Sequence, residues 1–202
     1  MGKNLSKTFL HVGCGKSNKS KLKGFNSEDW HETRFDIDKN VKPDIVGTMT
    51  DISIVKNESF DAIYSSHNIE HLYPHEVTFA IDEFYRVLKS DGFVVITCPD
   101  LISVCKAVVN DNLLKPLYQS PAGPISPIDI IYGHRGFIAN GNEFMAHKCG
   151  FTYSVLCSVF YQAGFKDTLG GARPNNYDLW LVAFKNKLSK EDAQNIAFSF
   201  LP

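Results

Sequence analysis

Six residues near the N-terminus, Leu10 to Gly15, constrain the fold of this chain more than any other segment. They read Leu-His-Val-Gly-Cys-Gly, and apolar residues that run into two glycines are typical of a buried strand that ends in a tight turn. Glycine lets the backbone of such a turn approach a ligand where a Cβ would collide with it. Asp36 follows at the spacing where a carboxylate can accept hydrogen bonds from both hydroxyls of a ribose. The pattern therefore predicts a turn that binds a nucleoside.

The third glycine of the dinucleotide-binding pattern is missing, and Asn18 stands in its place. Without that glycine, a pyrophosphate on the N-terminus of a closely packed helix is disfavoured. The residues therefore favour a nucleoside without phosphates, which argues against NAD and for S-adenosylmethionine. Two glycines alone also fit a tight turn in an unrelated α/β protein.

The composition fits a single domain with residues 1–202 in one unit. A chain of 202 residues with 44% hydrophobic residues can bury about 70% of its unfolded surface. The net charge of −1 gives no general attraction to nucleic acids or anionic membranes, and neither is expected as a partner. Five cysteines without a C-x-x-C pair argue against a disulfide framework and a zinc ribbon. With no apolar signal segment or membrane span in the sequence, we expect a cytoplasmic protein.

Strands and helices are expected to alternate along the first half of the chain. Strands are predicted at residues 7–12, 33–37, 43–46, 59–64 and 93–98. A helix is predicted over residues 67–88, because apolar side chains recur there at helical spacing before Ser90-Asp91-Gly92. Such alternation favours a doubly wound, mostly parallel sheet that is covered on both faces and connected by right-handed crossovers.

The regular alternation of strands and helices is interrupted at the start of the second half of the chain. Residues 100–150 contain several prolines and scattered aromatic residues, so we expect a long irregular insertion that binds the second substrate. Beyond it, a helix over 151–163 and a hairpin over 165–185 are predicted. The tail, residues 186–202, should contain a short helix that Ser189 caps, with Asp192 completing the capping box.

Residues 7 to 100 resemble the class I S-adenosylmethionine-dependent methyltransferases, particularly the type-11-like group. The resemblance rests on five segments: Leu10 to Gly15, Asp36, Thr48 to Ile52, Ser59 to Leu72 and Arg86 to Gly92. It implies a Rossmann-like sheet of seven mostly parallel strands with an antiparallel last strand, and S-adenosylmethionine as the cofactor.

The resemblance also implies roles for individual positions. Gly13 and Gly15 would line the methionine and ribose, Asp36 would bind the ribose, and Asp51 would meet the adenine amino group. His11 stands where family members often have an acidic residue. The full set of expected cofactor contacts is His11, Gly13, Cys14, Gly15, Asp36, Ile37, Met49, Thr50, Asp51, Ile52, Ser65, Ser66 and His67.

Candidate catalytic residues follow strand four, whose carboxyl end should face the ligand. Methyl transfer is an in-line displacement at an activated sulfonium, so placing the acceptor supplies most of the barrier reduction. A base matters when the acceptor is a hydroxyl or a protonated amine. His67 is the candidate, because imidazole accepts a proton near neutral pH. The alternative is that His67 shapes the cofactor pocket without transferring a proton.

Glu70 and His71 lie three and four positions after His67, so a helix would place all three on one face, and we include them among the catalytic candidates. The resulting H-x-x-E-H also describes an inverted zinc-protease motif and could serve a magnesium-assisted methyltransferase. No third metal ligand is evident, so we predict no metal site and keep a metal-dependent hydrolase as the weaker alternative.

The insertion concentrates polar groups among aromatic residues, and we expect His134, Arg135, Asn142 and His147 to bind the acceptor. Arg135 could bind a carboxylate or phosphate in bidentate fashion. The alternative is a network that ties the insertion to the domain. No Asn-Pro-Pro-Tyr follows strand four, which disfavours amino-methylating enzymes of nucleic acids and proteins. We therefore expect a small-molecule or saccharide acceptor that is methylated at oxygen or nitrogen. A non-catalytic cofactor-binding module or partner subunit is the alternative, and the oligomeric state stays open.

Overall fold

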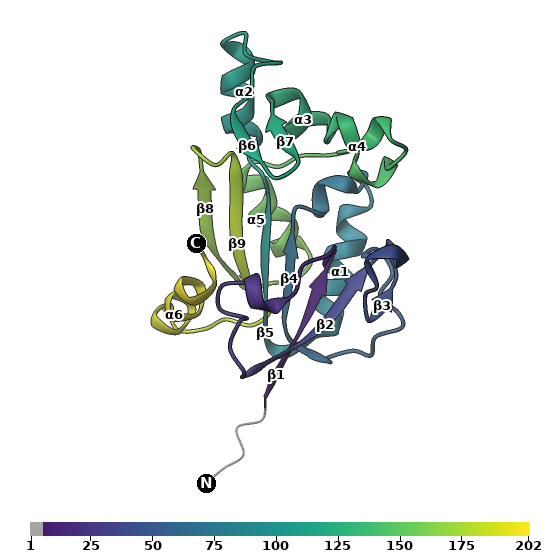
Figure 1. The fold of residues 1–202 in the computed structure, drawn as a ribbon. Helices are drawn as coiled ribbons and strands as arrows, with labels where there is room; N and C mark the ends of the chain where they lie inside the picture. Colours follow the sequence, from purple (N-terminus) through teal and green to yellow (C-terminus); the bar gives the residue numbers. More distant parts are fainter. Residues whose placement is uncertain (1–5) are drawn as a thin grey trace.

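The computed structural model describes residues 6–202 and arranges seven strands in one sheet in the order β3-β2-β1-β4-β5-β9-β8 (Figure 1). The strands are β1 (Lys7–Val12), β2 (Trp30–Asp36), β3 (Ile45–Val46), β4 (Phe60–Ser66), β5 (Leu88–Pro99), β8 (Asp167–Arg173) and β9 (Asp178–Phe184). The first five are parallel, and β9 runs antiparallel between β5 and β8. This confirms the doubly wound sheet with a reversed last strand, and the predicted terminal hairpin supplies β8 and β9.

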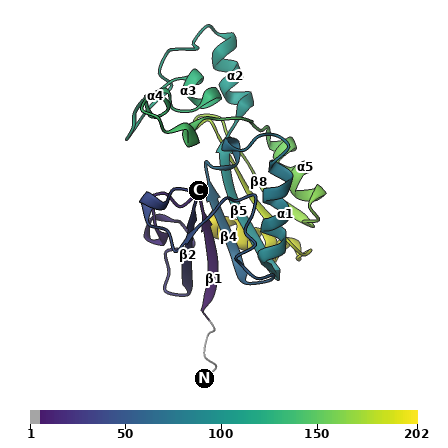
Figure 2. The same cartoon turned by 90° about the vertical axis from the view of Figure 1, so that its right-hand side faces the viewer.

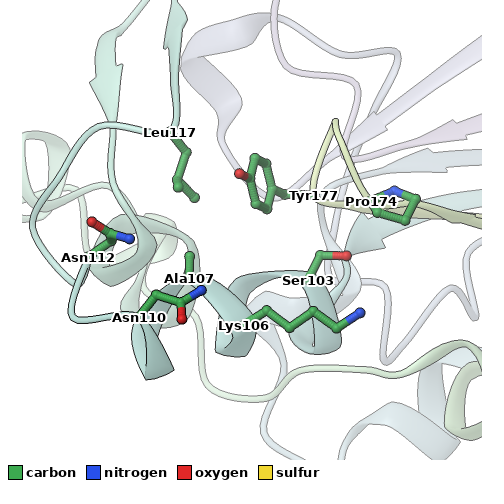
Figure 3. A pocket seen from close by; sticks show the side chains of 8 residues that line it. All are labelled: Ser103, Lys106, Ala107, Asn110, Asn112, Leu117, Pro174 and Tyr177. Atoms are coloured by element: carbon green, nitrogen blue, oxygen red, sulfur yellow. The ribbon is translucent and has the colours of Figure 1, made fainter.

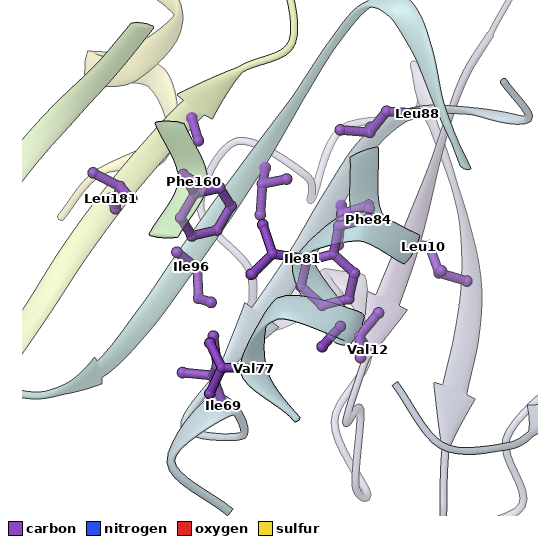
Figure 4. Close-up of a cluster of buried hydrophobic side chains, with 14 of the residues drawn as sticks. Leu10, Val12, Ile69, Val77, Ile81, Phe84, Leu88, Ile96, Phe160 and Leu181 are labelled. Carbon is purple, nitrogen blue, oxygen red and sulfur yellow. The ribbon is translucent and has the colours of Figure 1, made fainter. Parts of the chain in front are cut away.

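Helices cover both faces of the sheet. Helices α1 (Val77–Val87) and α5 (Tyr153–Gln162) pack on one face, and α6 (Lys190–Phe200) packs on the other (Figures 1 and 2). Successive residues of β5 alternate between the two cores. Val94 and Ile96 lie in the core that contains α1, where Figure 4 shows Ile96. Val95 lies in the core that contains α6. Burial on both faces explains why the sequence of β5 is an uninterrupted apolar run.

The C-terminal helix completes the second core. The connection between β1 and β2 contains one short 3-10 helix, η1 (Lys19–Lys21), so the aromatic rings of Phe25 and Trp30 are covered by α6 instead. Phe200 of α6 lies 4.5 Å from the ring of Phe25, centroid to centroid. Ser189 caps α6 by accepting a hydrogen bond from the Asp192 N–H, as predicted. The segment predicted as a tail is therefore part of the core.

The predicted helix over residues 67–88 is wrong over its first ten residues. A 3-10 turn, η3 (Ile69–His71), is separated by Pro74 from α1, which begins at Val77. His67 adopts a left-handed backbone conformation with φ of 54°, and a residue before proline disfavours the helical region. The apolar residues at helical spacing begin only at Val77, and Ile69 reaches the same core from η3.

The insertion is folded, which corrects the expectation of a long irregular loop. It contains α2 (Leu101–Val109), a hairpin of β6 (Tyr118–Ser120) and β7 (Gly123–Ile125), α3 (Pro127–Tyr132), α4 (Arg135–Ala139) and η4 (Glu143–Met145). Its prolines stand where short elements tolerate them, such as Pro127 at the start of α3. The insertion lies over the carboxyl ends of β4 and β5 (Figures 1 and 2). Among residues 6–202, no helix is long and apolar enough to cross a membrane.

Candidate functional site

The turn after β1 has both glycines in the left-handed region, with φ of 65° at Gly13 and 52° at Gly15. The two glycines have different neighbours. A Cβ on Gly13 would overlap the side chain of Asn68, whereas a Cβ on Gly15 would meet no atom of residues 6–202 within 4 Å. Asn68 Nδ2 donates to the carbonyl oxygens of Val12 and Ser66, each at 3.0 Å. Gly13 therefore makes room for Asn68, and Gly15 faces open space.

Asp36 lies beside this turn, at the end of β2. Its Oδ2 accepts a hydrogen bond from the Gly15 N–H at 2.7 Å, and its Oδ1 accepts one from the Asp38 N–H at 2.8 Å. The carboxylate is buried, and each oxygen keeps a further lone pair for a ligand. Ile37 follows with 48% of its surface exposed, so an apolar side chain stands next to the fixed carboxylate.

The segment after β3 forms a turn that α1 holds in place. Ile52 is fully buried, and its N–H donates to Oε2 of Glu83 at 2.7 Å. Met49 is half-buried and packs against the α1 core. Asp51 is exposed, and hydrogen bonds from Ser53 lower the pKa of its carboxyl group. The residues predicted to contact adenine are thus of two kinds: the apolar side chains of Met49 and Ile52, which pack into the protein, and the exposed carboxylate of Asp51.

His11 lies on the α6 face of the sheet and acts on the turn through Glu32. Its Nδ1 is 2.7 Å from Oε1 of Glu32, and Oε2 of Glu32 accepts a hydrogen bond from the Lys19 N–H at 2.9 Å. Burial lowers the pKa of His11, against the opposing effect of Glu32. Cys14 is buried, which raises the pKa of its thiol to about 11. The side chains of His11 and Cys14 therefore support the turn from within the protein.

His67 extends from the end of β4 and is held by its backbone. Its N–H donates to the carbonyl oxygen of Thr97 on β5 at 2.9 Å, and its side chain is 50% exposed. Nδ1 of His67 lies 3.4 Å from Oε1 of Glu70. The surrounding protein shields part of the ring from water, which would lower the pKa of His67, but the contact with Glu70 outweighs this and raises the pKa above its ordinary value.

Glu70 is almost completely buried, with 1% of its side chain exposed. Burial would raise the pKa of its carboxyl group, but the neighbouring His67 outweighs burial and lowers it. The backbone oxygen of Glu70 accepts hydrogen bonds from the N–H groups of Lys148 and Cys149, at 2.8 and 3.2 Å. Glu70 thus lies where η3 meets the end of the insertion.

The structure brings His147 of the insertion to Glu70 and His71. One candidate ligand atom from each of the three lies within 4.8 Å of the other two. This grouping was missed in the sequence, where a third partner for Glu70 and His71 was not evident. His147 is far along the chain and belongs to no local motif, so only the tertiary fold reveals the grouping.

The other predicted acceptor residues make contacts within the insertion. Arg135 forms a bidentate pair with Asp129, with Nε–Oδ1 at 2.7 Å and Nη2–Oδ2 at 3.2 Å. His134 caps α4 by accepting a hydrogen bond from the Phe137 N–H at 3.2 Å. Asn142 is exposed next to η4. The contacts of Arg135 and His134 fit the alternative in which this network holds the insertion together, and acceptor binding by them stays a prediction.

A cavity of about 300 Å³ lies between α2 and the turn that joins β8 to β9 (Figure 3). Ser103 and Lys106 line it from α2, and Tyr177 and Leu117 face each other across it (Figure 3). None of its lining residues was singled out in the sequence, because these residues are scattered along the chain and form no motif.

The first 100 residues of the chain match a known family. A sequence model of the methyltransferase-domain family matches residues 10–96, the range that contains the glycine turn, Asp36 and His67. This match and the order of the seven strands support a class I S-adenosylmethionine-dependent methyltransferase. The same match and the S-adenosylmethionine-dependent neighbours support S-adenosylmethionine as the cofactor of this methyltransferase. No curated protein sequence matches the chain.

Solved structures share the fold of this methyltransferase at low sequence identity. An S-adenosylmethionine-dependent methyltransferase from Archaeoglobus fulgidus has a TM-score of 0.57 and 15% identity, over 89% of this chain and 86% of that one. The 1,6-didemethyltoxoflavin-N1-methyltransferase of Burkholderia thailandensis, bound to 1,6-didemethyltoxoflavin and S-adenosylhomocysteine, has a TM-score of 0.53 and 14% identity, over 90% and 72%. A Bordetella parapertussis protein reaches a TM-score of 0.60 at 16% identity; the alignment covers 90% of this methyltransferase but 62% of that longer chain.

The described residues fit the cofactor of the family. A ribose requires an acceptor with free lone pairs, which Asp36 provides beside Gly15, and an adenine ring requires an apolar surface, which Ile37 offers. The open space at Gly15 leaves the turn accessible to a ligand.

Proposed function

We propose that this methyltransferase transfers the methyl group of S-adenosylmethionine to an oxygen or nitrogen atom of a small molecule or saccharide. The observation that carries the proposal is the hydrogen bond between the Gly15 N–H and Asp36, 2.7 Å long. This hydrogen bond joins the glycine turn after β1 to Asp36, the last residue of β2. Both lie at the C-terminal ends of the parallel strands, where ligands of open α/β sheets bind. A fixed carboxylate beside an open glycine turn fits a ribose, and Asn18 in place of the third glycine favours a nucleoside over a phosphate-bearing dinucleotide.

In the mechanism we propose, the protein mainly positions the two reactants. The cofactor, when bound, supplies a methyl group that its sulfonium already activates. Asp36 would bind the ribose, and Ile37, Met49 and Ile52 would border the adenine. Holding the acceptor in line with the methyl group would supply most of the barrier reduction, because well-oriented reactants gain about 7–11 kcal/mol from proximity.

His67 is the residue we propose as proton acceptor. It keeps a left-handed conformation that costs a non-glycine residue roughly 1–2 kcal/mol, and strain of this kind is concentrated at functional sites. Its ring is half exposed at the carboxyl end of β4, so an acceptor can reach it. Glu70, next to Nδ1, would orient the ring and leave Nε2 for the acceptor.

The insertion supports an acceptor of limited size. Its short helices and the β6–β7 hairpin lie over the carboxyl ends of β4 and β5, and this cover favours a small acceptor over a polymer (Figure 1). Exposed polar groups on it, Asn142 among them, would bind hydroxyl or amino groups of a small molecule or saccharide.

Cofactor binding is tested first, by calorimetry and by the melting temperature. S-adenosylhomocysteine should bind and stabilise the native chain by about 2.7 kcal/mol at a hundredfold excess over Kd, whereas NAD should not. Release of S-adenosylhomocysteine from S-adenosylmethionine in the presence of saccharides, phenols and amines then tests turnover. A larger thermal shift with NAD would contradict the cofactor site. Tight cofactor binding without turnover on any class of acceptor would favour the non-catalytic module.

A further inference from the structure

Glu70, His71 and His147 come together where the core meets the insertion. Glu70 and His71 belong to η3, directly after β4, and His147 lies near the end of the insertion. Candidate ligand atoms of the three residues lie within 4.8 Å of one another. Backbone hydrogen bonds from Lys148 and Cys149 to the Glu70 oxygen fix the two segments side by side. Backbone hydrogen bonds therefore hold together the two segments that carry these side chains.

The Glu70 carboxylate lacks the partners that a buried charge requires. Neither of its oxygens forms a hydrogen bond with any group in residues 6–202. Oε1 has the contact with His67 at 3.4 Å, which leaves Oε2 without a partner among the described residues. An ionised carboxylate in such a place is costly unless it is paired or bound to a metal. A cation between Glu70 and the two histidines would supply the missing partner.

Each of the two histidine rings contacts a backbone carbonyl oxygen through Nδ1. Nδ1 of His71 lies 3.1 Å from the carbonyl oxygen of Ala146, and Nδ1 of His147 lies 2.7 Å from the carbonyl oxygen of Ile130. A carbonyl only accepts, so each Nδ1 must carry the proton and each neutral ring keeps its free lone pair on Nε2. A backbone carbonyl on the far ring nitrogen is the usual support of a metal-bound histidine.

We propose that Glu70, His71 and His147 bind one divalent transition-metal ion of the zinc type. Two imidazoles and one carboxylate form a ligand set that zinc accepts with a fourth position for water or substrate, and imidazole disfavours Mg²⁺ and Ca²⁺. Ligand atoms at zinc bond lengths of about 2.0–2.2 Å stand roughly 3.4 Å apart, so binding must draw the three side chains inward. Oε1 of Glu70 can keep its contact with His67 while Oε2 binds the ion.

The ion would connect the insertion to the core. Two ligands come from η3 and one from the insertion, so metal binding and docking of the insertion are thermodynamically linked. This inference does not depend on methyl transfer, because the three side chains are brought together by the fold whether or not a methyl donor is bound.

The test uses the full chain, stripped of metal with a chelator and then titrated with Zn²⁺ by calorimetry and with Co²⁺ by visible absorption. We expect one Zn²⁺ per chain, a higher melting temperature and Co²⁺ absorption of a low-symmetry nitrogen and oxygen site. Mg²⁺ should give neither heat nor stabilisation. Glu70→Gln and His147→Gln should each lower Zn²⁺ affinity more than about 100-fold, since both remove a direct ligand.

His75→Gln is the matched control, because His75 is an exposed histidine close to η3 that lies outside the cluster. It should bind Zn²⁺ like the unmodified chain. If Glu70→Gln does not fold, His147→Gln decides, because His147 is only half-buried. The proposal would be overturned if Zn²⁺ did not bind stoichiometrically, or if the unmodified chain and His147→Gln bound it with equal affinity. The three side chains would then interact with their protein neighbours alone.

Discussion

Asn68 occupies the space that a side chain on Gly13 would need. Its Nδ2 donates to the carbonyl oxygens of Val12 and Ser66, and lies 3.2 Å from Oγ of Ser65. One side-chain amide thereby connects the turn after β1 to the end of β4. Position 13 must therefore be glycine to leave room for Asn68, whereas Gly15 leaves the turn open to a ligand.

Replacing each glycine by alanine should separate these two roles. Both substitutions place a Cβ in the left-handed region, at a cost of about 1–2 kcal/mol. Gly13→Ala must also displace Asn68, so we expect it to lower the free energy of unfolding by about 2–4 kcal/mol, against about 1 kcal/mol for Gly15→Ala. Urea denaturation measures both. Equal losses in the two variants would contradict the assigned role of Asn68, and Gly13→Ala combined with Asn68→Ala should recover part of the loss.

Asp36→Ala should weaken binding of S-adenosylhomocysteine by about 2–4 kcal/mol. The ribose hydroxyls would lose a charged acceptor, and the Gly15 N–H would lose its partner in the turn. Calorimetry measures the affinity. Asp38→Ala is the matched control, because Asp38 caps the neighbouring 3-10 helix by accepting from the Asn40 N–H and should leave affinity nearly unchanged. A larger loss in the Asp38 variant would assign the ribose to that residue.

The regular elements of the fold could be predicted because local patterns determine them. The bounds of β1 were predicted as observed, and the apolar run of β5 was recognised, since burial on both faces leaves a continuous hydrophobic signal. The helix was predicted to begin ten residues too early, because its apolar spacing starts only at Val77 and the break at Pro74 was not taken into account. The helices of the insertion were missed because they are short, and prolines at their edges obscure helical periodicity.

The parts of the candidate site that belong to local sequence motifs could be predicted. The contacts between residues far apart in the sequence could not. Asp36 and the glycine turn were recognised from their spacing, and the structure places them in contact. The pairing of Arg135 with Asp129, and the approach of His147 to Glu70, depend on how the insertion folds. No local pattern encodes such contacts, because they join residues through space.

His67→Gln should lower kcat by roughly 10²–10⁴ once an acceptor is identified, because a positioned base typically contributes that much. Affinity for S-adenosylhomocysteine should change little, since glutamine keeps a polar side chain at the same strained position. Steady-state kinetics and calorimetry on the same preparation separate the two effects. His75→Gln serves as the control. A kcat within about threefold of the unmodified enzyme would mean that His67 shapes the pocket without accepting a proton.

Asp61→Asn should change how stability depends on pH. Asp61 accepts a hydrogen bond from the Thr8 N–H at 2.8 Å and pairs with Lys89 Nζ at 2.9 Å. Burial would raise the pKa of Asp61, but Lys89 and Thr8 outweigh it and lower the pKa below its ordinary value of 3.8. Because the folded pKa is the lower one, this stability is fully present above the unfolded pKa and is lost as pH falls through the folded pKa.

At pH 7 we expect Asp61→Asn to be less stable by about 1–2 kcal/mol, since asparagine keeps one acceptor oxygen but loses the ion pair with a partly exposed lysine. The difference from the unmodified chain should stay constant down to about pH 5 and narrow below about pH 4. Urea midpoints at pH 7, 5, 4 and 3 measure it. Asp82→Asn, at an exposed position on α1, is the control and should show no such narrowing. A difference that persists or widens at pH 3 would show that the charge of Asp61 contributes nothing to the fold, and that its hydrogen bonds with Thr8 carry the whole effect.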